Sequence, residues 1–250
     1  MTRLAIISSP RSGNSWTRSV IAKGLRIPEL AVHDYADLQA LPDRCVVQVH
    51  WYREPHFQRF LASERFAVLT LARHPLDVLL SVLHFVQHEP ETSKWLLGNC
   101  EIPAALQHHG PTSDTFLDYC LSWGAENLLS ITYQWWHDKD AIKARYEDLV
   151  RQPADGFAGI AAALGESADR LSEALAQRNL EHFQATPNKH GWRGIPNHWQ
   201  TMIPRSFADQ IRDRHARVFD CLGYTVPDYE LDADEARETW AKLRIRPTTT

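Results

Sequence analysis

Short, continuous apolar runs recur along the chain, and longer stretches with helical spacing separate them. The runs Leu4–Ser8, Cys45–Trp51 and Phe66–Ala72 show almost no alternation of polar and apolar residues. Such runs are typical of parallel strands that are buried on both faces. The more polar segment Ala141–Leu149 is a fourth strand candidate.

Apolar residues recur at helical spacing between and after these strands. The predicted helices are Asn14–Gly24, the segment that Pro75 opens, Thr115–Trp136 with a break, Pro153–Leu164, Ala168–Gln177 and Ser206–Leu222. Proline is favoured in the first turn of a helix. Because strands alternate with helices, we predict an α/β fold, a three-layer sandwich with a central, mostly parallel sheet.

The length of 250 residues suits one large α/β domain, and we expect a single domain over residues 1–250. Two stretches, 89–114 and 186–204, are rich in Pro, Gly and His. Long loops of this kind often serve function, so we expect both to cover a site. The last residues, 244–250, are expected to fray.

Composition narrows the function classes. The chain is 44% hydrophobic and 23% charged, as in soluble globular proteins, and its net charge of −4 argues against nucleic-acid binding as the main task. No window reaches the ~18 apolar residues of a membrane-spanning helix. The four scattered cysteines indicate neither a disulfide framework nor a zinc site. With no targeting segment visible, we expect a cytoplasmic protein.

The stretch "SSPRSGNSW", residues 8–16, follows the first strand and opens the first helix. A turn of this kind directs backbone N–H groups and the positive end of the helix dipole at an anion. Gly13 permits a close approach of the backbone, and Arg11 adds a charge. The GxxxxGK[ST] loop of nucleotide kinases is absent. The alternative is a surface turn with Trp16 as a core residue.

Polar residues follow the next two strands as well. His50 follows the apolar part of the second strand, and Arg73 follows the third. Because active sites of open parallel sheets lie at the carboxyl ends of strands, we expect both near the residue 8–16 loop. Ser81, on the helix after Pro75, could face the same edge. Taken alone, a His at a strand end is more often structural.

Several motifs, in order, resemble those of the sulfotransferases that depend on 3′-phosphoadenylyl sulfate (PAPS). "SPRSGNSW" is similar to the 5′-phosphosulfate loop, and "LARHPLDVLLSVLHF" to the 3′-phosphate motif. "VQVHW" is similar to the strand with the catalytic His, "ARYEDL" to a Y-E-D-L strand, and "WRGIPNHW" to a degenerate form of a late R-K-G-x-x-G-D-W segment. The matches run from residue 5 to about residue 205 and imply a P-loop NTPase-like fold.

The resemblance implies which residues hold the donor. The 5′-phosphate would lie on the loop residues Arg11, Ser12, Gly13, Asn14 and Ser15. The 3′-phosphate would lie on Arg73, Ser81, Arg193 and Gly194. Trp16 would stack on adenine and Tyr146 would lie nearby, although a buried strand tyrosine is an equal interpretation of Tyr146. The product would be 3′,5′-ADP (PAP), and no metal is implied.

The resemblance also implies the reaction. His50 would act as general base toward a hydroxyl of a small-molecule acceptor, a phenol, alcohol or sugar. Arg11 stands where relatives have Lys, and it would stabilise the negative charge that develops on the leaving oxygen. Gln48 stands where many relatives have Lys. Trp51, Phe85 and Trp95 would line the acceptor pocket. A homodimer is compatible with the family, although the dimer segment of some relatives is not evident after Trp199.

Two other functions stay open at this stage. One is a small-molecule kinase of the P-loop type, which shares the strand–loop–helix start. The other is a nucleotide-binding relative that has lost turnover, because Arg11, Gln48 and Trp192 depart from the family pattern. The pair His84 and His88 has metal-ligand spacing, but the Glu of an HExxH motif is absent.

Overall fold

The computed structural model describes residues 3–38, 41–89, 91–94, 96, 100–179 and 194–244. They divide into two compact units. The first unit comprises Met1–Arg73 with Leu129–Pro196, and the second comprises His74–Leu128 with Asn197–Thr250. The expectation of a single domain stays a prediction.

The first unit is built on a five-stranded sheet in which every pairing is parallel. Its strands are β1 (Arg3–Ile7), β2 (Glu29–Val32), β3 (Cys45–Val49), β4 (Phe66–Ala72) and β5 (Ile142–Arg145). Their spatial order is β2-β3-β1-β4-β5. Strands β2 and β3 lie on one side of β1, and β4 and β5 lie on the other, so the strand order switches sides at β1. Open α/β sheets bind ligands at such switch points.

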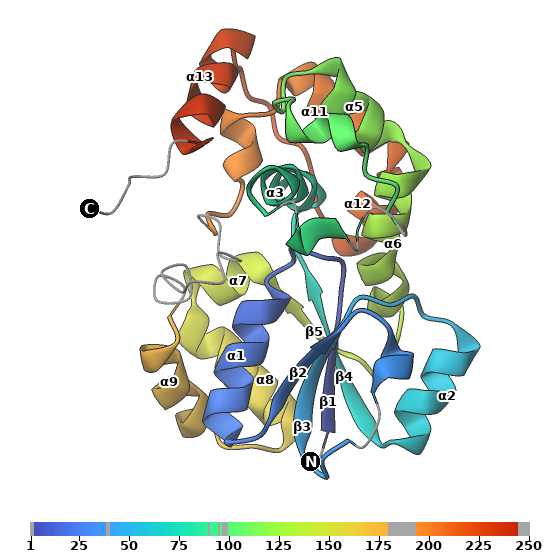
Figure 1. The fold of residues 1–250 in the computed structure, drawn as a ribbon. Coiled ribbons are helices and arrows are strands. Elements are labelled where there is room, and N and C mark those ends of the chain that lie inside the picture. The colour runs from blue at the N-terminus through green and yellow to red at the C-terminus, as the bar shows by residue number, and fades with distance from the viewer. Residues whose placement is uncertain are drawn as a thin grey trace. The chain divides into compact units, whose positions relative to one another are not determined.

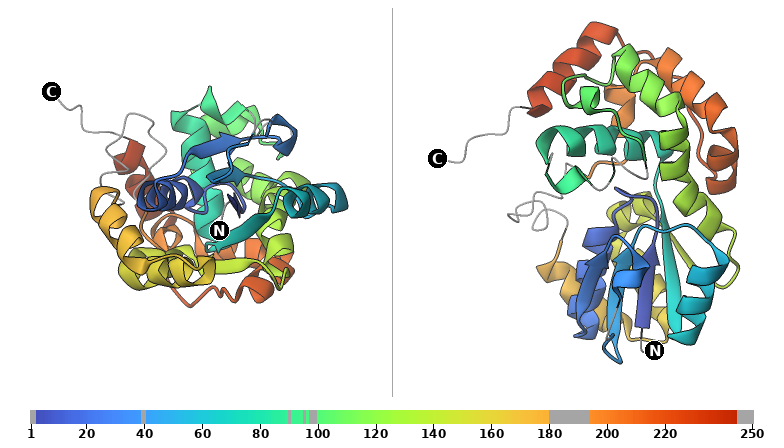
Figure 2. Two further views of the ribbon diagram at one scale, coloured as in Figure 1. Left: turned by 90° about the horizontal axis from the view of Figure 1, so that it is seen from below. Right: turned by 45° about the vertical axis from the view of Figure 1, so that its right-hand side comes forward.

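Helices cover both faces of this sheet, which confirms the predicted three-layer α/β fold (Figure 1). The helices of the first unit are α1 (Asn14–Leu25), α2 (Pro55–Ser63), α7 (Tyr146–Arg151), α8 (Pro153–Leu164), α9 (Ala168–Gln177) and the later part of α6 (Trp123–Trp136). Figure 2 shows α1 and α9 on one side of the strands and α2 on the other.

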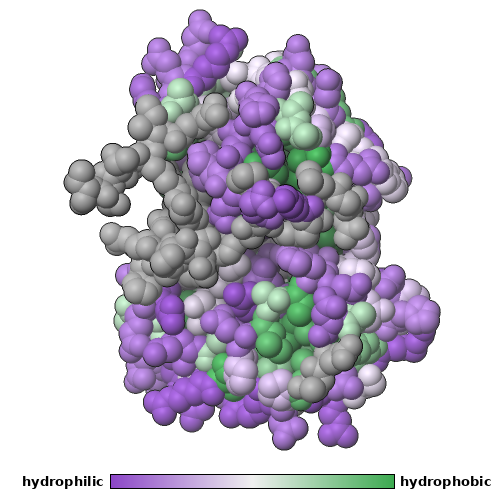
Figure 3. All heavy atoms as spheres, viewed as in Figure 1, coloured by the Kyte–Doolittle hydropathy of each residue, from purple (hydrophilic) through white to green (hydrophobic). Residues whose placement is uncertain are grey.

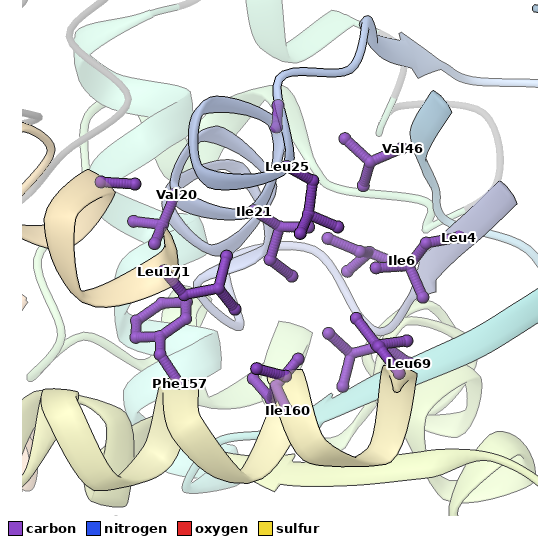
Figure 4. Close-up of a cluster of buried hydrophobic side chains, with 14 of the residues drawn as sticks. Leu4, Ile6, Val20, Ile21, Leu25, Val46, Leu69, Phe157, Ile160 and Leu171 are labelled. Carbon is purple, nitrogen blue, oxygen red and sulfur yellow. The ribbon is translucent and has the colours of Figure 1, made fainter. Parts of the chain in front are cut away.

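Two apolar clusters join these layers. On one face, side chains of α1, α8 and α9, among them Ile21, Ile160 and Leu171, pack on Leu4 and Leu69 of the strands (Figure 4). On the other face, α2 and α6 contribute a second cluster. Because side chains of β1 are buried in both clusters, the strand is apolar from Leu4 to Ile7, as the undivided run predicts.

The edge strand β2 was not predicted. It has only four residues, and its exposure alternates between half-buried Leu30 and Val32 and two exposed positions. A strand of this kind lacks the continuous apolar run of the central strands. Figure 3 shows a mostly hydrophilic face with apolar residues gathered over the lower part, where Figure 1 places β2.

The second unit is helical. It holds α3 (Pro75–His88), α5 (Asp114–Leu121), the start of α6, α11 (Arg205–Arg214), α12 (Ala216–Leu222) and α13 (Ala233–Arg244). Short 3-10 turns are η2 (Thr92–Lys94), η3 (Ala104–Gln107) and η4 (His198–Thr201), and η1 (Tyr35–Asp37) belongs to the first unit. Pro75 opens α3 as predicted.

Two predicted elements were wrong in their extent. The strand predicted for Ala141–Leu149 ends at Arg145, and Tyr146 opens α7 instead. Glu147 and Asp148 fall in the first turn of that helix, where acidic residues are favourable. The helix predicted for Ser206–Leu222 is two helices, because His215 leaves helical geometry and its ring bonds the Cys120 carbonyl at 2.7 Å.

Candidate active site

The turn between β1 and α1 has a backbone shape suited to an anion. Arg11 and Gly13 both have positive φ, 67° and 93°. Strained conformations of non-glycine residues, such as that of Arg11, cluster at functional sites. A Cβ on Gly13 would lie 2.5 Å from the Tyr146 ring, so only glycine fits here. The tight turn leads into the N-terminus of α1, where the N-cap residue Gly13 provides no side-chain hydrogen bond.

Several polar groups of this turn form hydrogen bonds that hold it in shape. The Ser8 hydroxyl accepts a hydrogen bond from the Leu71 N–H at 2.7 Å. The Ser9 N–H donates to the Thr132 hydroxyl at 2.8 Å. The Asn14 amide donates to the Ser9 carbonyl at 3.0 Å, and its role as a side-chain donor to phosphate stays a prediction. The turn is thereby tied to β4 and α6.

Buried polar atoms remain at the start of α1. The hydroxyls of Ser12 and Thr17 are 1% and 0% exposed as residues, and neither has a hydrogen-bond partner among the described residues. Buried polar groups are almost always paired, so these two hydroxyls, together with Oδ1 of Asn14, which also has no partner in the described part of the chain, are candidates to contact a ligand. The sequence predicted Ser12 but missed Thr17, whose position inside the helix gave no signal.

Arg73 extends this site from the end of β4. It is 7% exposed, and its guanidinium Nη1 donates to the Arg11 carbonyl at 2.8 Å. Its Cζ lies 4.5 Å from the centre of the Tyr146 ring. Its Nε has no hydrogen-bond partner, and no carboxylate forms a salt bridge with it, among the described residues. A buried cation without a carboxylate calls for another anion.

His50 follows β3 and contacts the same turn. Its Nδ1 lies 2.7 Å from the Ser8 carbonyl oxygen, and its Nε2 lies 3.1 Å from Nε2 of Gln48. Burial lowers the pKa of His50 to about 4, and the positive charge of Arg18 and Arg11 acts in the same direction. The ring is therefore neutral near pH 7 and has one nitrogen able to accept a proton.

Gln48 connects His50 to α1. Its side-chain oxygen accepts hydrogen bonds from the Ser15 hydroxyl at 3.2 Å and from Arg18 Nη1 at 2.8 Å. Ser15, predicted to hold phosphate, thus uses its hydroxyl hydrogen on Gln48 in this structure. The sequence did not indicate Arg18, because its partners come from strands far away along the chain.

Trp16 and Tyr146 pack together behind the turn. Trp16 is 3% exposed, its indole N–H donates to the Arg178 carbonyl at 2.8 Å, and its ring meets Phe157 edge-on at 5.4 Å. These are the contacts of a core residue, and stacking on a base stays a prediction. The Tyr146 hydroxyl donates to the Gly194 carbonyl at 2.9 Å, which joins the turn to a segment of the late motif.

Ser81 and Phe85 lie on α3 in the second unit and are 1% and 4% exposed. Their predicted roles toward the donor and the acceptor stay predictions. Asp77 on the same helix accepts hydrogen bonds from the backbone N–H groups of Asn197 and Trp199 at 2.7 and 3.0 Å. The Asp of the 3′-phosphate motif therefore holds the late segment in place.

Of the remaining predicted residues, Trp51 lies within the described part of the chain, and two others do not. Trp51 is half-buried, donates its indole N–H to Glu54 at 2.9 Å and packs edge-on against Tyr35 at 5.2 Å. Arg193 and Trp95 lie outside the described residues, as does Trp192.

The described segments contain no group of three or more His, Cys, Asp or Glu side chains that could hold a metal ion. None of their helices combines the length and hydrophobicity needed to cross a membrane.

Comparison with known proteins places this geometry in context. Residues 1–206 match a family model described as "Sulfotransferase domain". No curated protein sequence matches the chain.

Solved structures show the same fold at low sequence identity. A mouse sulfotransferase complexed with PAP has a TM-score of 0.65 and 16% identity, with 89% of this chain and 88% of that chain covered. A retinol dehydratase complexed with androsterone and inactive cofactor PAP has a TM-score of 0.62 and 16% identity, with 91% and 82% covered. A second structure of retinol dehydratase, with retinol and PAP, also has a TM-score of 0.62.

Proposed function

The chain belongs to the sulfotransferase domain family, and from that premise we propose that it moves a sulfuryl group from PAPS to a hydroxyl of a small-molecule acceptor and releases PAP. One observation carries the proposal. The buried Arg73 guanidinium lies beside the uncapped N-terminus of α1 with no carboxylate partner among the described residues. A donor with two separated phosphates would supply anions to both features.

The 5′-phosphate would lie on the turn of residues 11–15. Backbone N–H groups at the start of α1 and the Ser12 hydroxyl would donate to it, and Arg11 would add charge. The 3′-phosphate would lie on Arg73, and the predicted ligands Ser81, Arg193 and Gly194 belong to the same proposal. The neighbouring folds that were crystallised with PAP support this choice of nucleotide.

The chemistry requires few covalent steps from the protein. The acceptor oxygen forms a bond to sulfur while the bond between sulfur and the 5′-phosphate oxygen breaks. Nε2 of His50 takes the hydroxyl proton, which its neutral state permits. Arg11 and the N-terminus of α1 stabilise the charge that develops on the leaving phosphate oxygen. Arg11 does not act as a general acid, because a guanidinium does not give up its proton.

In this proposal, Trp51, Phe85 and Trp95 line the pocket of the acceptor. Retinol dehydratase was crystallised with retinol and with androsterone, which are apolar alcohols, and this supports a small-molecule hydroxyl. A cytoplasmic location is also part of the proposal, and it is supported by four cysteines that are not joined in disulfides in the described residues. The proposal also includes assembly of the protein as a homodimer.

The test is transfer of radioactive sulfur from PAPS to a panel of phenols, alcohols and sugars. We expect the wild-type protein to label at least one acceptor. His50→Ala should abolish labelling while PAP affinity changes less than about threefold. Phosphate transfer from ATP with Mg²⁺ would instead support a kinase, and PAP binding without labelling of any acceptor would indicate a relative without turnover.

A further inference from the structure

A chain of hydrogen bonds runs from the edge strand β2 to the proposed base. Glu29 accepts from Arg18 Nε at 2.9 Å, and Arg18 Nη1 donates to the Gln48 oxygen at 2.8 Å. The Gln48 nitrogen lies 3.1 Å from His50 Nε2, and His50 Nδ1 lies 2.7 Å from the Ser8 carbonyl. All five residues belong to the first unit.

The chemistry of the partners fixes each proton in this chain. A guanidinium can only donate, so the Gln48 atom that meets Arg18 is the amide oxygen. The amide nitrogen then faces His50 and donates to Nε2, which must carry a lone pair. The Ser8 carbonyl can only accept, so Nδ1 carries the ring hydrogen. The hydrogen bonds at the two ring nitrogens therefore both favour the neutral Nδ1–H tautomer of His50.

We propose that Gln48 is a positioning residue for His50: its amide, oriented by Arg18, keeps Nε2 free of a proton and directs its lone pair along β3 until an acceptor hydroxyl enters. This inference rests on the proposed function, in which His50 is the general base. The amide is a neutral donor and gives way to the incoming hydroxyl, whose proton then moves to Nε2. Arg18 acts through Gln48 and touches no reacting atom in this scheme.

The charges around His50 agree with this role. Arg18 on α1, Arg11 in the turn and His33 after β2 all disfavour a charged imidazolium, and the Ser8 carbonyl alone favours it. A protonated Nε2 would also point its hydrogen at the Gln48 amide hydrogens. A residue with a merely structural role at position 48 would affect stability without affecting the protonation of His50.

The experiment is an NMR titration of the full chain with ¹⁵N-labelled histidine, in which His50 is assigned by the signal lost in His50→Gln. In the wild type we expect the Nδ1–H tautomer at pH 7. Gln48→Glu offers Nε2–H an acceptor and keeps a partner for Arg18, so it should raise the pKa of His50 by about one unit or more. Gln48→Leu only removes the donor and should raise the pKa less.

A matched control is Gln210→Glu, which changes an exposed glutamine on α11 in the same way. It should leave the titration of His50 unchanged. The inference is overturned if His50 titrates at the same pH in the wild type, Gln48→Glu and Gln48→Leu, or if wild-type Nε2 carries the ring hydrogen. Gln48→Leu keeps the test decisive should Gln48→Glu not fold.

Sulfuryl transfer provides the second readout. In Gln48→Glu, the pH below which kcat falls should rise by as much as the pKa of His50. In Gln48→Leu, kcat should fall about tenfold while KM for PAPS stays within twofold. If His50 responds as expected but the wild type labels no acceptor, the proposed function fails and the hydrogen-bond chain stands. If the wild type is active and Gln48→Glu does not change the pH profile, the positioning role of Gln48 is contradicted and the proposed function stands.

Discussion

The guanidinium of Arg73, at the end of β4, donates to the carbonyl oxygen of Arg11 in the turn after β1, at 2.8 Å. This bond joins the buried guanidinium of Arg73 to the backbone of the turn that precedes α1. A buried cation that forms no salt bridge with a carboxylate of the described residues needs another anion. The donor nucleotide is that anion in our account.

Arg73→Ala should weaken PAP binding by about 10- to 100-fold, the range expected for a lost charge-assisted hydrogen bond. The affinity for 5′-AMP, which lacks the 3′-phosphate, should change much less. Isothermal titration calorimetry with both ligands makes the comparison, and Arg151→Ala, an exposed arginine of α7, is the control. Equal losses for the two nucleotides would show that Arg73 does not bind the 3′-phosphate.

Gly13→Ala should disrupt the turn. The residue has a φ of 93°, and the added Cβ would lie 2.5 Å from the Tyr146 ring. We expect a loss of more than about 1 kcal/mol in the free energy of unfolding and a large loss of PAP affinity. Gly159→Ala is the matched control, because nothing lies within 4 Å of its added Cβ and alanine favours a helix. A Gly13→Ala variant with wild-type affinity would contradict the described turn.

The pH dependence of stability should report on His50. Its pKa in the folded protein is lowered from 6.5 to about 4, so the unfolded chain takes up the proton first. The stability that this group contributes is therefore present above pH 6.5 and is lost as the pH falls toward 4. Urea unfolding at pH 7 and pH 4.5 should show a larger loss for the wild type than for His50→Gln. Parallel losses in both proteins would contradict a neutral, buried His50.

Substitution of Trp16 can separate its packing in the core from its predicted stacking on adenine. Trp16→Phe removes the hydrogen bond to the Arg178 carbonyl and part of the packing on Phe157. It should lower the free energy of unfolding by about 1–3 kcal/mol. Trp123→Phe, at a residue that is 60% exposed, should have little effect. If PAP affinity of Trp16→Phe falls more than about tenfold at a temperature where the variant is folded, stacking on adenine is supported.

The fold was predictable where burial leaves an unambiguous pattern. The apolar runs of β1, β3 and β4 identify the central strands because both of their faces are covered. The same reasoning missed β2, since an edge strand with exposed positions has no such run, and it missed α2 and α13. It also extended β5 from Arg145 to Leu149, because the residue pattern alone does not show where a strand ends and a helix begins.

The sequence predicted only those site residues whose type and position in a motif indicate a chemical role. The turn residues, His50 and Arg73 follow strands, so the topology of a parallel sheet brings them to one edge. The orphaned hydroxyl of Thr17 and the link from Arg18 through Gln48 to His50 depend on side-chain contacts between α1 and β3. Local sequence patterns do not encode such contacts between elements distant in the chain.

The central claim, that two phosphates of one adenosine donor bind at the edge formed by the turn and Arg73, is tested most directly by the dissociation constant of PAP. Calorimetry with PAP, 5′-AMP, ATP with Mg²⁺ and NAD should give the tightest binding for PAP, by at least about tenfold over 5′-AMP. Binding of ATP with Mg²⁺ or NAD more tightly than PAP, or no binding of PAP at all, would contradict it.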